Sequence, residues 1–301
     1  MIADPVCSSM QPATIAQALA AANRLIDPVD ARLLLEYVLH VYHVYLLTHP
    51  EHQLTEQQAA NFSQLIQERA KGLPVAYLTG ERPFYDLTFH VTNAVLIPRP
   101  ETELLVEWAL QLIPADRPER ILDLGTGSGA IAITLAKHRP RSYVVAVDLS
   151  PDAITVARQN AKTLNVTNLE FVTGNWFDEL SREKFDLIVS NPPYVAEHDP
   201  HLQQGDLRFE PEIALSAGND GLACIDHIIA AAPGYLAANG WLLLEHGYDQ
   251  AEACRRLLQQ ADFNNICSKP DLAGIMRVSG GQLNFSVLSL CSVPGATMKD
   301  A

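Results

Sequence analysis

The sequence predicts an α/β fold: a parallel β-sheet covered by helices on both faces, preceded by a helical region and a β-hairpin. Three observations predict it. From residue 120 onward, short apolar runs alternate with segments of helical periodicity. Residues 14–72 keep helical periodicity throughout. Residues 76–100 alternate β-branched or aromatic residues with polar ones, and Gly and Pro punctuate them, which is typical of a hairpin.

The first part of the chain predicts three helices. Thr14, with Gln17 three residues later, forms a capping-box pattern that opens the first helix. The second is expected over residues 31–47, and the third runs from Thr55 to a glycine stop near residues 71–72. We therefore expect a helical domain over residues 1–76, followed by a hairpin linker and connecting helix over residues 77–114.

The rest of the chain predicts the sheet. Residues 115–282 are expected to form one domain, with residues 283–301 as a C-terminal extension in which 283–290 is either an edge strand or a tail. Ligands of such sheets bind beyond the carboxyl ends of the strands. The expected strands are residues 121–124, 143–147, 169–172, 185–190 and 241–245. The expected helices are residues 101–112, 130–137, 151–164, 222–237 and 250–260.

Composition narrows the class of partner. The 301 residues carry 21 Lys and Arg against 35 Asp and Glu, a formal net charge of −14, which is unfavourable for gripping a phosphate polymer. The five cysteines are scattered without a C-x-x-C pair, and the histidine pairs, such as His198 and His201, lack an evident third ligand, so no metal is expected. The N-terminus lacks a signal-peptide pattern. We expect a cytoplasmic monomer that binds neither nucleic acid nor membrane.

A glycine loop follows the first expected strand and opens a helix, in the segment LDLGTGSGA at residues 122–130. Gly125, Gly127 and Gly129 allow positive φ and a close approach of ligand to backbone. Asp148 ends the next strand about twenty residues later, where a carboxylate accepts hydrogen bonds from ribose hydroxyls. This pattern predicts a nucleoside cofactor; the alternative is a glycine-rich turn without a ligand.

Two classes of cofactor fit this loop. The spacing Gly125-x-Gly127-x-x-Ala130 also satisfies the loose dinucleotide pattern. Asp123 favours S-adenosyl-L-methionine, because its sulfonium and ammonium groups are cationic, whereas a pyrophosphate would be repelled.

The residues after the third strand favour an adenine site. Asn175 offers an acceptor for the adenine amino group. Trp176 or Phe177 offers an apolar wall, unless that residue belongs only to the core.

The segment SNPPYV, residues 190–195, is stiffer than a turn requires. An amide or aromatic amino nitrogen is a poor nucleophile, because its lone pair is delocalised. A site can still bind both N–H bonds and aim that lone pair at a methyl group. Asn191 would accept one N–H, the carbonyl of Pro192 would accept the other, and the flat ring of Tyr194 would hold the planar group. A rigid loop is the alternative.

Four longer segments resemble one family. Residues 74–110, 121–136, 185–195 and 207–222 look like the protein-glutamine N5-methyltransferases of the HemK/PrmC group. The resemblance implies a helical bundle, a hairpin linker and a Rossmann-like class I methyltransferase domain. It also implies S-adenosyl-L-methionine as cofactor and, as substrate and partner, the Gly-Gly-Gln glutamine of class I peptide-chain release factors.

The resemblance assigns roles to residues of this chain. The loop Gly125, Thr126, Gly127, Ser128 and Gly129 would hold the methionine end of the cofactor, Asp148 the ribose, and Asn175 and Trp176 the adenine. Asn191, Pro192, Pro193 and Tyr194 would hold the glutamine amide, with Asn191 also near the cofactor. Residues 97–101 would border the cleft, and Arg99 there either binds substrate or pairs with an acidic neighbour.

The sequence departs from this family at two places, and three other functions are alternatives to the one that the resemblance implies. Asn175 stands where the family often has aspartate, which predicts weakened adenine binding, and residues 275–280 differ from the family at the last strand. The rival functions are an amino-methyltransferase acting on a nucleic-acid base, a non-catalytic cofactor-binding scaffold, and a dinucleotide enzyme. Gly280-Gly281-Gln282 repeats the substrate tripeptide, so self-methylation at Gln282 is a further hypothesis, with chance as the stronger explanation.

Overall fold

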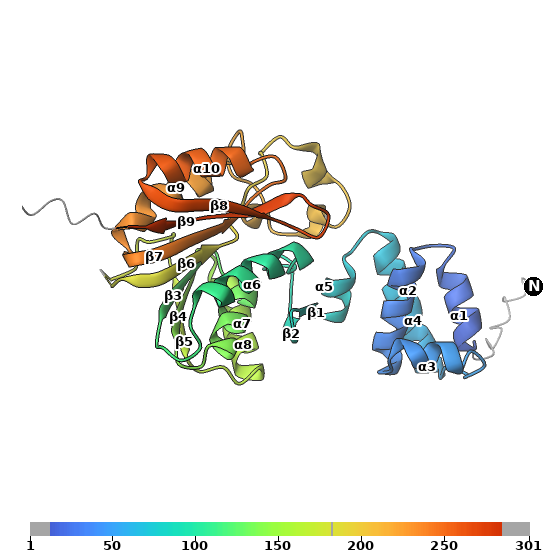
Figure 1. Cartoon of the computed structure of the whole chain (residues 1–301). Helices are drawn as coiled ribbons and strands as arrows, with labels where there is room; N and C mark the ends of the chain where they lie inside the picture. Colours follow the sequence, from blue (N-terminus) through green and yellow to red (C-terminus); the bar gives the residue numbers. More distant parts are fainter. Residues whose placement is uncertain (1–12, 182, 285–301) are drawn as a thin grey trace, which may run out of the picture.

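A computed structural model describes residues 13–181 and 183–284 of the chain (Figure 1). Within these residues seven strands form one sheet in the order β5-β4-β3-β6-β7-β9-β8. Strands β3 to β7 are parallel, and β9 runs antiparallel to both β7 and β8. The strands are β3 (Arg120–Leu124), β4 (Tyr143–Asp148), β5 (Leu169–Thr173), β6 (Phe185–Ser190), β7 (Leu236–Glu245), β8 (Phe263–Pro270) and β9 (Met276–Leu283).

Helices cover both faces of this sheet, as the alternation of strand and helix predicts (Figure 1). Because neighbouring side chains of a strand point to opposite faces, Ile121 joins one core cluster and Leu122 the other. One cluster includes residues of α6 (Glu103–Leu112), α7 (Ala130–His138) and α8 (Pro151–Thr163). The other includes residues of α9 (Ala223–Ala231) and α10 (Ala251–Gln260). The helix expected over 222–237 ends early, since Pro233 follows it in a 3-10 turn, η5 (Ala232–Gly234).

The N-terminal helices pack around a core of their own (Figure 1). Thr14 and Thr55 each make a complete capping box with the glutamine three residues later, as the sequence predicts for Thr14. The expectation of one helix over residues 31–47 is wrong, because His40 adopts φ 53° and ends the helix there. The helices are α1 (Ile15–Ala22), α2 (Pro28–Leu39), α3 (His43–Thr48) and α4 (Glu56–Ala70).

The connection to the sheet begins with a helix, where the sequence predicts extended structure. Residues Val75–Thr79 form α5, which follows Pro74 and stops at Gly80, whose φ is 73°. The predicted hairpin comes next, with β1 (Glu81–Phe84) paired to β2 (Leu87–His90). The helix predicted over 101–112 is present as a 3-10 turn, η1 (Pro100–Thr102), followed by α6.

Strand β8 has no counterpart in the sequence prediction, and β9 appears there only as the last strand that the family resemblance places near residues 275–280. Gly280 and Gly281 lie inside β9 opposite Leu243 and Leu242, and a Cβ on Gly281 would come within 2.8 Å of the Cβ of Phe263. Glycine is therefore needed here because the strand passes close to its neighbours. Of the predicted C-terminal extension, residues 285–301 lie outside the described residues.

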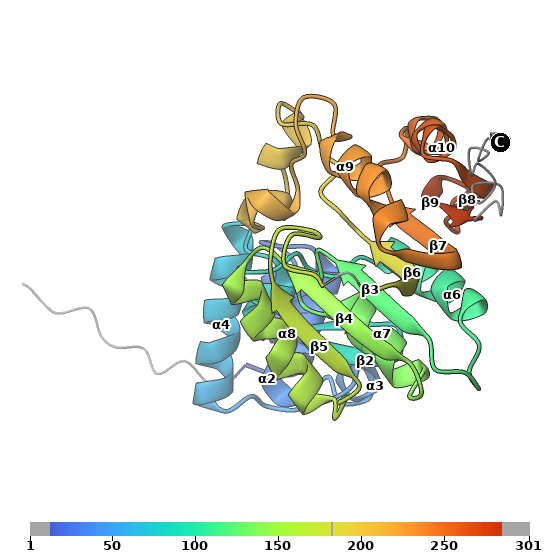
Figure 2. The ribbon, with the colours of Figure 1, turned by 90° about the vertical axis from the view of Figure 1, so that its left-hand side faces the viewer.

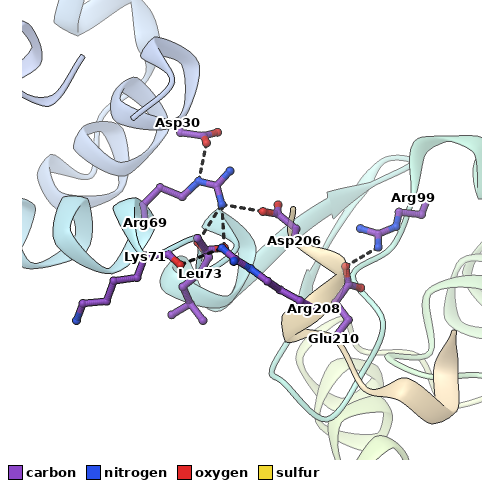
Figure 3. A network of polar contacts seen from close by, with 9 residues as sticks. Asp30, Arg69, Lys71, Leu73, Arg99, Asp206, Arg208 and Glu210 are labelled. Atoms are coloured by element: carbon purple, nitrogen blue, oxygen red, sulfur yellow. Dashed lines mark hydrogen bonds and ion pairs between the residues drawn. The ribbon is translucent and has the colours of Figure 1, made fainter. Parts of the chain in front are cut away.

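A polar network joins the helical region to the long segment between β6 and α9 (Figure 3). Arg69, in the last turn of α4, donates from Nε to Asp30 and from Nη1 to Asp206, both at 2.7 Å. Arg208 donates to the carbonyl of Lys71 at 3.0 Å. Figure 2 shows this segment reaching the end of α4. The two parts of the molecule are therefore connected by charged hydrogen bonds.

None of the helices in residues 13–181 and 183–284 is both long enough and apolar enough to cross a bilayer.

Candidate active site

A cavity of about 290 Å³ lies at the carboxyl edge of the parallel strands. Its walls come from the loops after β3, β4, β5 and β6, from residues 94–96 after the hairpin, and from residues 211–216. Open α/β sheets bind ligands at this edge, where the strand order reverses between β3 and β6. The fold therefore brings together the loops that the sequence singles out.

The glycine loop is fixed to the end of β4. The N–H groups of Gly125 and Thr126 both donate to the carbonyl of Val147 at 2.9 Å. Gly127 donates to Oδ2 of Asp148 at 2.8 Å, while Ser150 donates to Oδ1 at 2.9 Å. Burial raises the pKa of the Asp148 carboxyl, and these two backbone bonds counteract the rise. Each oxygen keeps a lone pair for a ligand hydroxyl.

Gly127 and Gly129 serve different purposes. Both have positive φ, 55° and 82°. A Cβ on Gly127, which lines the cavity, would meet no atom of the described residues within 4 Å. A Cβ on Gly129 would come within 2.7 Å of Ile133 Cδ1. The bare backbone at Gly127 therefore leaves room for a ligand, whereas Gly129 leaves room for the first turn of α7.

Asp123 is completely buried beneath the glycine loop. Its Oδ2 accepts a hydrogen bond from the Thr126 hydroxyl at 2.6 Å, whereas its Oδ1 has no partner among the described residues. Burial, followed by the nearby charge of Asp148, raises the pKa of Asp123 to about 7, and the Thr126 bond opposes this rise. An acceptor is thus available under the loop.

The residues after β5 divide between cavity and core. Trp176, at φ 53°, lines the cavity, and its ring lies 3.6 Å from where a Cβ of Gly125 would be. Asn175 also lines it and donates from Nδ2 to Asp178, which leaves its Oδ1 as an acceptor. Phe177 is buried and stacks on Tyr235 at 4.5 Å. Of the two candidate walls, only Trp176 borders the cavity.

Asn191 and Pro193 bring the end of β6 to the same cavity. The Asn191 side chain donates from Nδ2 to the Thr102 hydroxyl at 3.2 Å, so its Oδ1 remains available as an acceptor. Pro192 is buried, and its carbonyl accepts no hydrogen bond from residues 13–181 or 183–284. Asn191 therefore offers an acceptor at the cavity wall, and the Pro192 carbonyl is a second acceptor at this strand end, although Pro192 lies outside the cavity lining.

Tyr194 leans away from the cavity toward β7. Its hydroxyl donates to Oε1 of Glu245 at 3.3 Å, and its carbonyl accepts from Gln250 at 3.0 Å. Burial, then the neighbouring Glu245 carboxylate, raises the pKa of the Tyr194 phenol, so the phenol stays protonated and remains a donor. Hydrogen bonds on the side away from the cavity therefore hold the Asn191–Tyr194 loop.

The predicted site residues thus fall into two groups. Those lining the cavity are Gly125, Gly127, Asp148, Asn175, Trp176, Asn191 and Pro193. Those outside its lining are Thr126, Ser128, Gly129, Pro192, Tyr194 and Arg99. The second group, apart from Arg99, belongs to the glycine loop and the Asn191–Tyr194 loop but does not line the cavity.

Arg99 lies elsewhere. It lines a groove between the helical region and the hairpin, and its Nη2 makes a 2.5 Å ion pair with Glu210. The buried Glu210 also accepts from the N–H of Ile97 at 3.0 Å. Of the two roles foreseen for Arg99, the acidic partner is present. His198 and His201, in the loop after Tyr194, also lie outside the lining of this cavity. The exposed His201 contacts Asp199 at 2.6 Å.

Several cavity residues are absent from the sequence prediction. Leu149 follows Asp148 and is half exposed at the rim, a position that the strand-end pattern could have indicated. Residues 211–216 belong to segment 207–222, which carries the family resemblance, but the sequence analysis assigns no site role to them. They include the 3-10 turn η4 (Glu212–Ala214), which follows η2 (Pro200–Gln203) and η3 (Leu207–Phe209), and Val195 bridges to Ser216. Cys224 has no signal in the sequence.

Two family models match the chain. Residues 13–80 match the PrmC N-terminal domain, and residues 101–206 match the Methyltransferase small domain. A release factor glutamine methyltransferase of Xylella fastidiosa is 47% identical over 264 residues, which cover 88% of this chain and 96% of that protein. The chain belongs to the release factor glutamine methyltransferase family.

Further relatives share that name. The release factor glutamine methyltransferase of Burkholderia pseudomallei is 48% identical over 90% of this chain and 97% of its own length. The one from Escherichia coli is 46% identical, with 84% and 91% covered. The resemblance and the fold class inferred from the sequence are therefore confirmed.

Solved structures share the fold. The hMettl16 catalytic domain, crystallised in complex with a 3′UTR hairpin, superposes with a TM-score of 0.54 at 14% identity and covers 94% of this chain and 95% of its own. A methyltransferase from Pyrococcus furiosus gives a TM-score of 0.50 at 16% identity, with 75% of this chain and 100% of its own covered. At these identities the likeness concerns the fold alone.

Family membership makes the chain a methyltransferase with S-adenosyl-L-methionine as cofactor, as the sequence predicts. The cavity fits this cofactor. Open space beside Gly127 admits the ligand to the backbone, and Asp148 keeps acceptors for hydroxyls. The ring of Trp176 and the free Oδ1 of Asn175 suit a flat base with an amino group.

Proposed function

We propose that this protein methylates N5 of the glutamine in the Gly-Gly-Gln motif of class I peptide-chain release factors. The observation that carries the proposal is the identity of 46–48% to release factor glutamine methyltransferases over most of the chain. The arrangement of Asn191 supports it, because the bond to Thr102 leaves Oδ1 as an acceptor. The division into a helical domain, a linker, a methyltransferase domain and an extension is part of the same proposal.

The cofactor supplies an electrophilic methyl group, and the chain supplies position. Oδ1 of Asn191 and the carbonyl of Pro192 would accept the two N–H bonds of the substrate amide, while Pro193 bounds the cavity beside them. Because proline fixes φ, the Pro192 carbonyl is aimed before substrate arrives. The nitrogen lone pair, left without a hydrogen bond, would face the methyl group in an SN2 displacement. The S–CH3 bond would break as the N–CH3 bond forms, the cofactor would leave as a neutral thioether, and one N–H proton would pass to solvent.

The helical region, residues 1–76 in the proposed division, would recognise the protein substrate. Apolar side chains on α2 and α3 support this role: Leu33 is 38% exposed, Tyr37 40% and Val44 67%. Tyr42, between the two helices, is 88% exposed. Leu33, Tyr37 and Tyr42 also line the groove that contains Arg99, which keeps substrate binding by Arg99 within the proposal. Exposed aromatic residues are favoured at protein interfaces.

Peptide mass spectrometry tests the function. The purified protein is incubated with S-adenosyl-L-methionine and a class I release factor, beside Asn191→Ala and the exposed control Asn264→Ala. We expect one added methyl on the Gly-Gly-Gln glutamine, a loss of about 100-fold or more in rate for Asn191→Ala, and wild-type behaviour for Asn264→Ala. Calorimetric titration checks that the cofactor still binds each variant.

A different outcome would redirect the assignment. Cofactor binding without any methyl on that glutamine removes release factors as substrates. An adenine- or cytosine-containing oligonucleotide in a parallel reaction then tests the rival substrate class, and no methyl there either leaves the scaffold interpretation.

A further inference from the structure

The structure holds a carboxyl group behind the Asn191 loop that neither the sequence prediction nor the proposed function uses. Glu245 ends β7, next to β6 in the sheet, and is 1% exposed. Its Oε1 accepts from the Tyr194 hydroxyl at 3.3 Å, and its Oε2 has no hydrogen-bond partner within the described residues. Burying a carboxyl group is costly unless hydrogen bonds or a charged partner compensate it.

Thr102 connects this carboxyl to Asn191. It stands at the N-terminus of α6, where threonine ordinarily caps a helix, yet its side chain makes no capping bond. Instead the buried hydroxyl accepts from Asn191 Nδ2 at 3.2 Å. The Thr102 hydroxyl is also among the groups that lower the pKa of Glu245. Its own proton has no other acceptor among the hydrogen bonds of the described chain. The unpartnered Oε2 of Glu245 is the acceptor that this proton would take.

These groups would form a hydrogen-bond relay from Asn191 through Thr102 to Glu245. Its direction follows from the donor and acceptor capacity of each group. An ionised carboxylate only accepts hydrogen bonds, so the Thr102 proton is directed to Glu245. The threonine oxygen must then accept, which selects the N–H₂ end of the Asn191 amide. The oxygen end is left facing the cavity. A neutral glutamic acid could instead donate to Thr102, and the threonine proton would then compete for the amide oxygen.

We propose that Glu245 and Thr102 are positioning residues that fix the orientation of the Asn191 amide, with Oδ1 toward the substrate, and that Glu245 also holds Tyr194. The proposal rests on the proposed function, since it concerns how the same site holds an amide. Neither residue touches the reacting atoms. Both act through the Asn191–Tyr194 loop.

The charge of Glu245 depends on its neighbours. Burial raises its pKa to about 7, opposed by the hydroxyls of Thr102 and Tyr194. From η1 the Glu101 carboxylate raises this pKa further, and from β9 the Arg277 guanidinium lowers it. Methyl transfer should therefore accelerate as pH rises through about 7, because only the ionised form sets the relay.

Four variants test the relay. Thr102→Val keeps the shape and removes the hydroxyl, and Thr102→Ser restores the hydroxyl. Thr134→Val is the matched control, because Thr134 is a buried threonine whose hydroxyl only bonds the Ala130 carbonyl within α7. Glu245→Gln removes the charge at nearly constant volume. Single-turnover rates on a release factor, cofactor affinity and melting temperature are measured for each across pH 5.5–8.5.

We expect Thr102→Val to slow methyl transfer by about 10- to 100-fold with unchanged cofactor affinity. Thr102→Ser and Thr134→Val should stay within a few-fold of wild type. Glu245→Gln should be slow and lose the acceleration through pH 7. The proposal is overturned by a wild-type rate in Thr102→Val, or by an unchanged pH profile in Glu245→Gln. If Thr102→Val does not fold, Glu245→Gln decides alone.

A second readout needs no activity. Hydrogen exchange of the Asn191 side-chain amide protons, followed by NMR, should be slow in the wild type and faster in Thr102→Val. Equal exchange in both proteins overturns the relay even if methylation is seen. Conversely, a wild type that methylates no release factor overturns the proposed function, while the exchange measurement still decides the relay.

Discussion

Arg69 Nη1 donates to Asp206 Oδ1 at 2.7 Å, across 137 positions of sequence. The same guanidinium holds Asp30 of α2 and the carbonyls of Gly72 and Leu73 (Figure 3). Five residues beyond Asp206, the chain begins to line the cofactor cavity at residues 211–216. One side chain of the helical region therefore holds a segment that bounds the active site.

Removing that side chain should loosen the segment. Arg69→Ala is expected to speed hydrogen exchange over residues 206–216 and to weaken cofactor binding several-fold, with a loss of about 1–3 kcal/mol in unfolding free energy. Arg69→Lys should not rescue it, because an ammonium cannot make the forked contacts. Arg32→Ala, which breaks a pair with Glu36 inside α2, is the control. Unchanged exchange over residues 206–216 in Arg69→Ala contradicts the prediction.

A double-mutant cycle should separate the two roles of Arg99. Glu210→Gln leaves an acceptor for Ile97 but weakens the ion pair with Arg99. If Arg99 acts only through Glu210, then Glu210→Gln and the double variant should have equal stability, and the KM for release factor should not change. A KM raised by Arg99→Ala alone, at constant stability, would show contact with substrate. Chemical denaturation and steady-state kinetics provide the two measurements.

The two loop glycines should fail in different ways. Gly127→Ala is expected to abolish detectable cofactor binding, because its methyl group enters the cavity, at a cost of about 1–2 kcal/mol in unfolding free energy for positive φ. Gly129→Ala adds a clash with Ile133 and should lower the melting temperature more. Calorimetric titration and thermal unfolding compare them. Equal melting temperatures would contradict the assignment.

Stability should fall as pH rises from about 4 to about 7. The pKa of Asp123 is raised to about 7 in the folded protein, so the folded state binds more protons than the unfolded state between about pH 4 and 7. This contribution is fully present below the unfolded pKa and is lost as pH approaches 7. Asp123→Asn should flatten the decline, as seen in thermal unfolding at stepwise pH. A decline of equal slope in the variant would refute the assignment.

The sequence predicts the parallel strands well because each is a short apolar run between turn signals. It fails at α5, where Val75 and Thr79 favour extended structure, yet packing of Ala76 and the glycine stop at Gly80 impose a helix. It also fails at His40, since apolar periodicity continues through residues 38–41 while the backbone turns. Packing against neighbouring elements determines the backbone at α5 and at His40, so a local sequence pattern cannot predict it.

The site residues also divide into those that the sequence predicts and those that it does not. Strand-end residues such as Asp148 and Asn191 follow from motif and position alone. The partner of Asn191 does not, because Thr102 lies 89 positions away in a turn with its own local preferences. Glu245 could have been predicted as a site residue, since it ends a predicted strand at the edge of the sheet where ligands bind.

The tripeptide Gly280-Gly281-Gln282 carries a consequence for selectivity. Gln282 pairs with Trp241 at the edge of the sheet opposite the active site, and its side chain is held by Asn239 and Asn265. Its amide is thus unavailable to the cavity unless β9 leaves the sheet. Under the proposed function, an enzyme that recognised only these three residues would also methylate itself. Selectivity would then depend on how the glutamine is presented, because Gln282 is held within a strand.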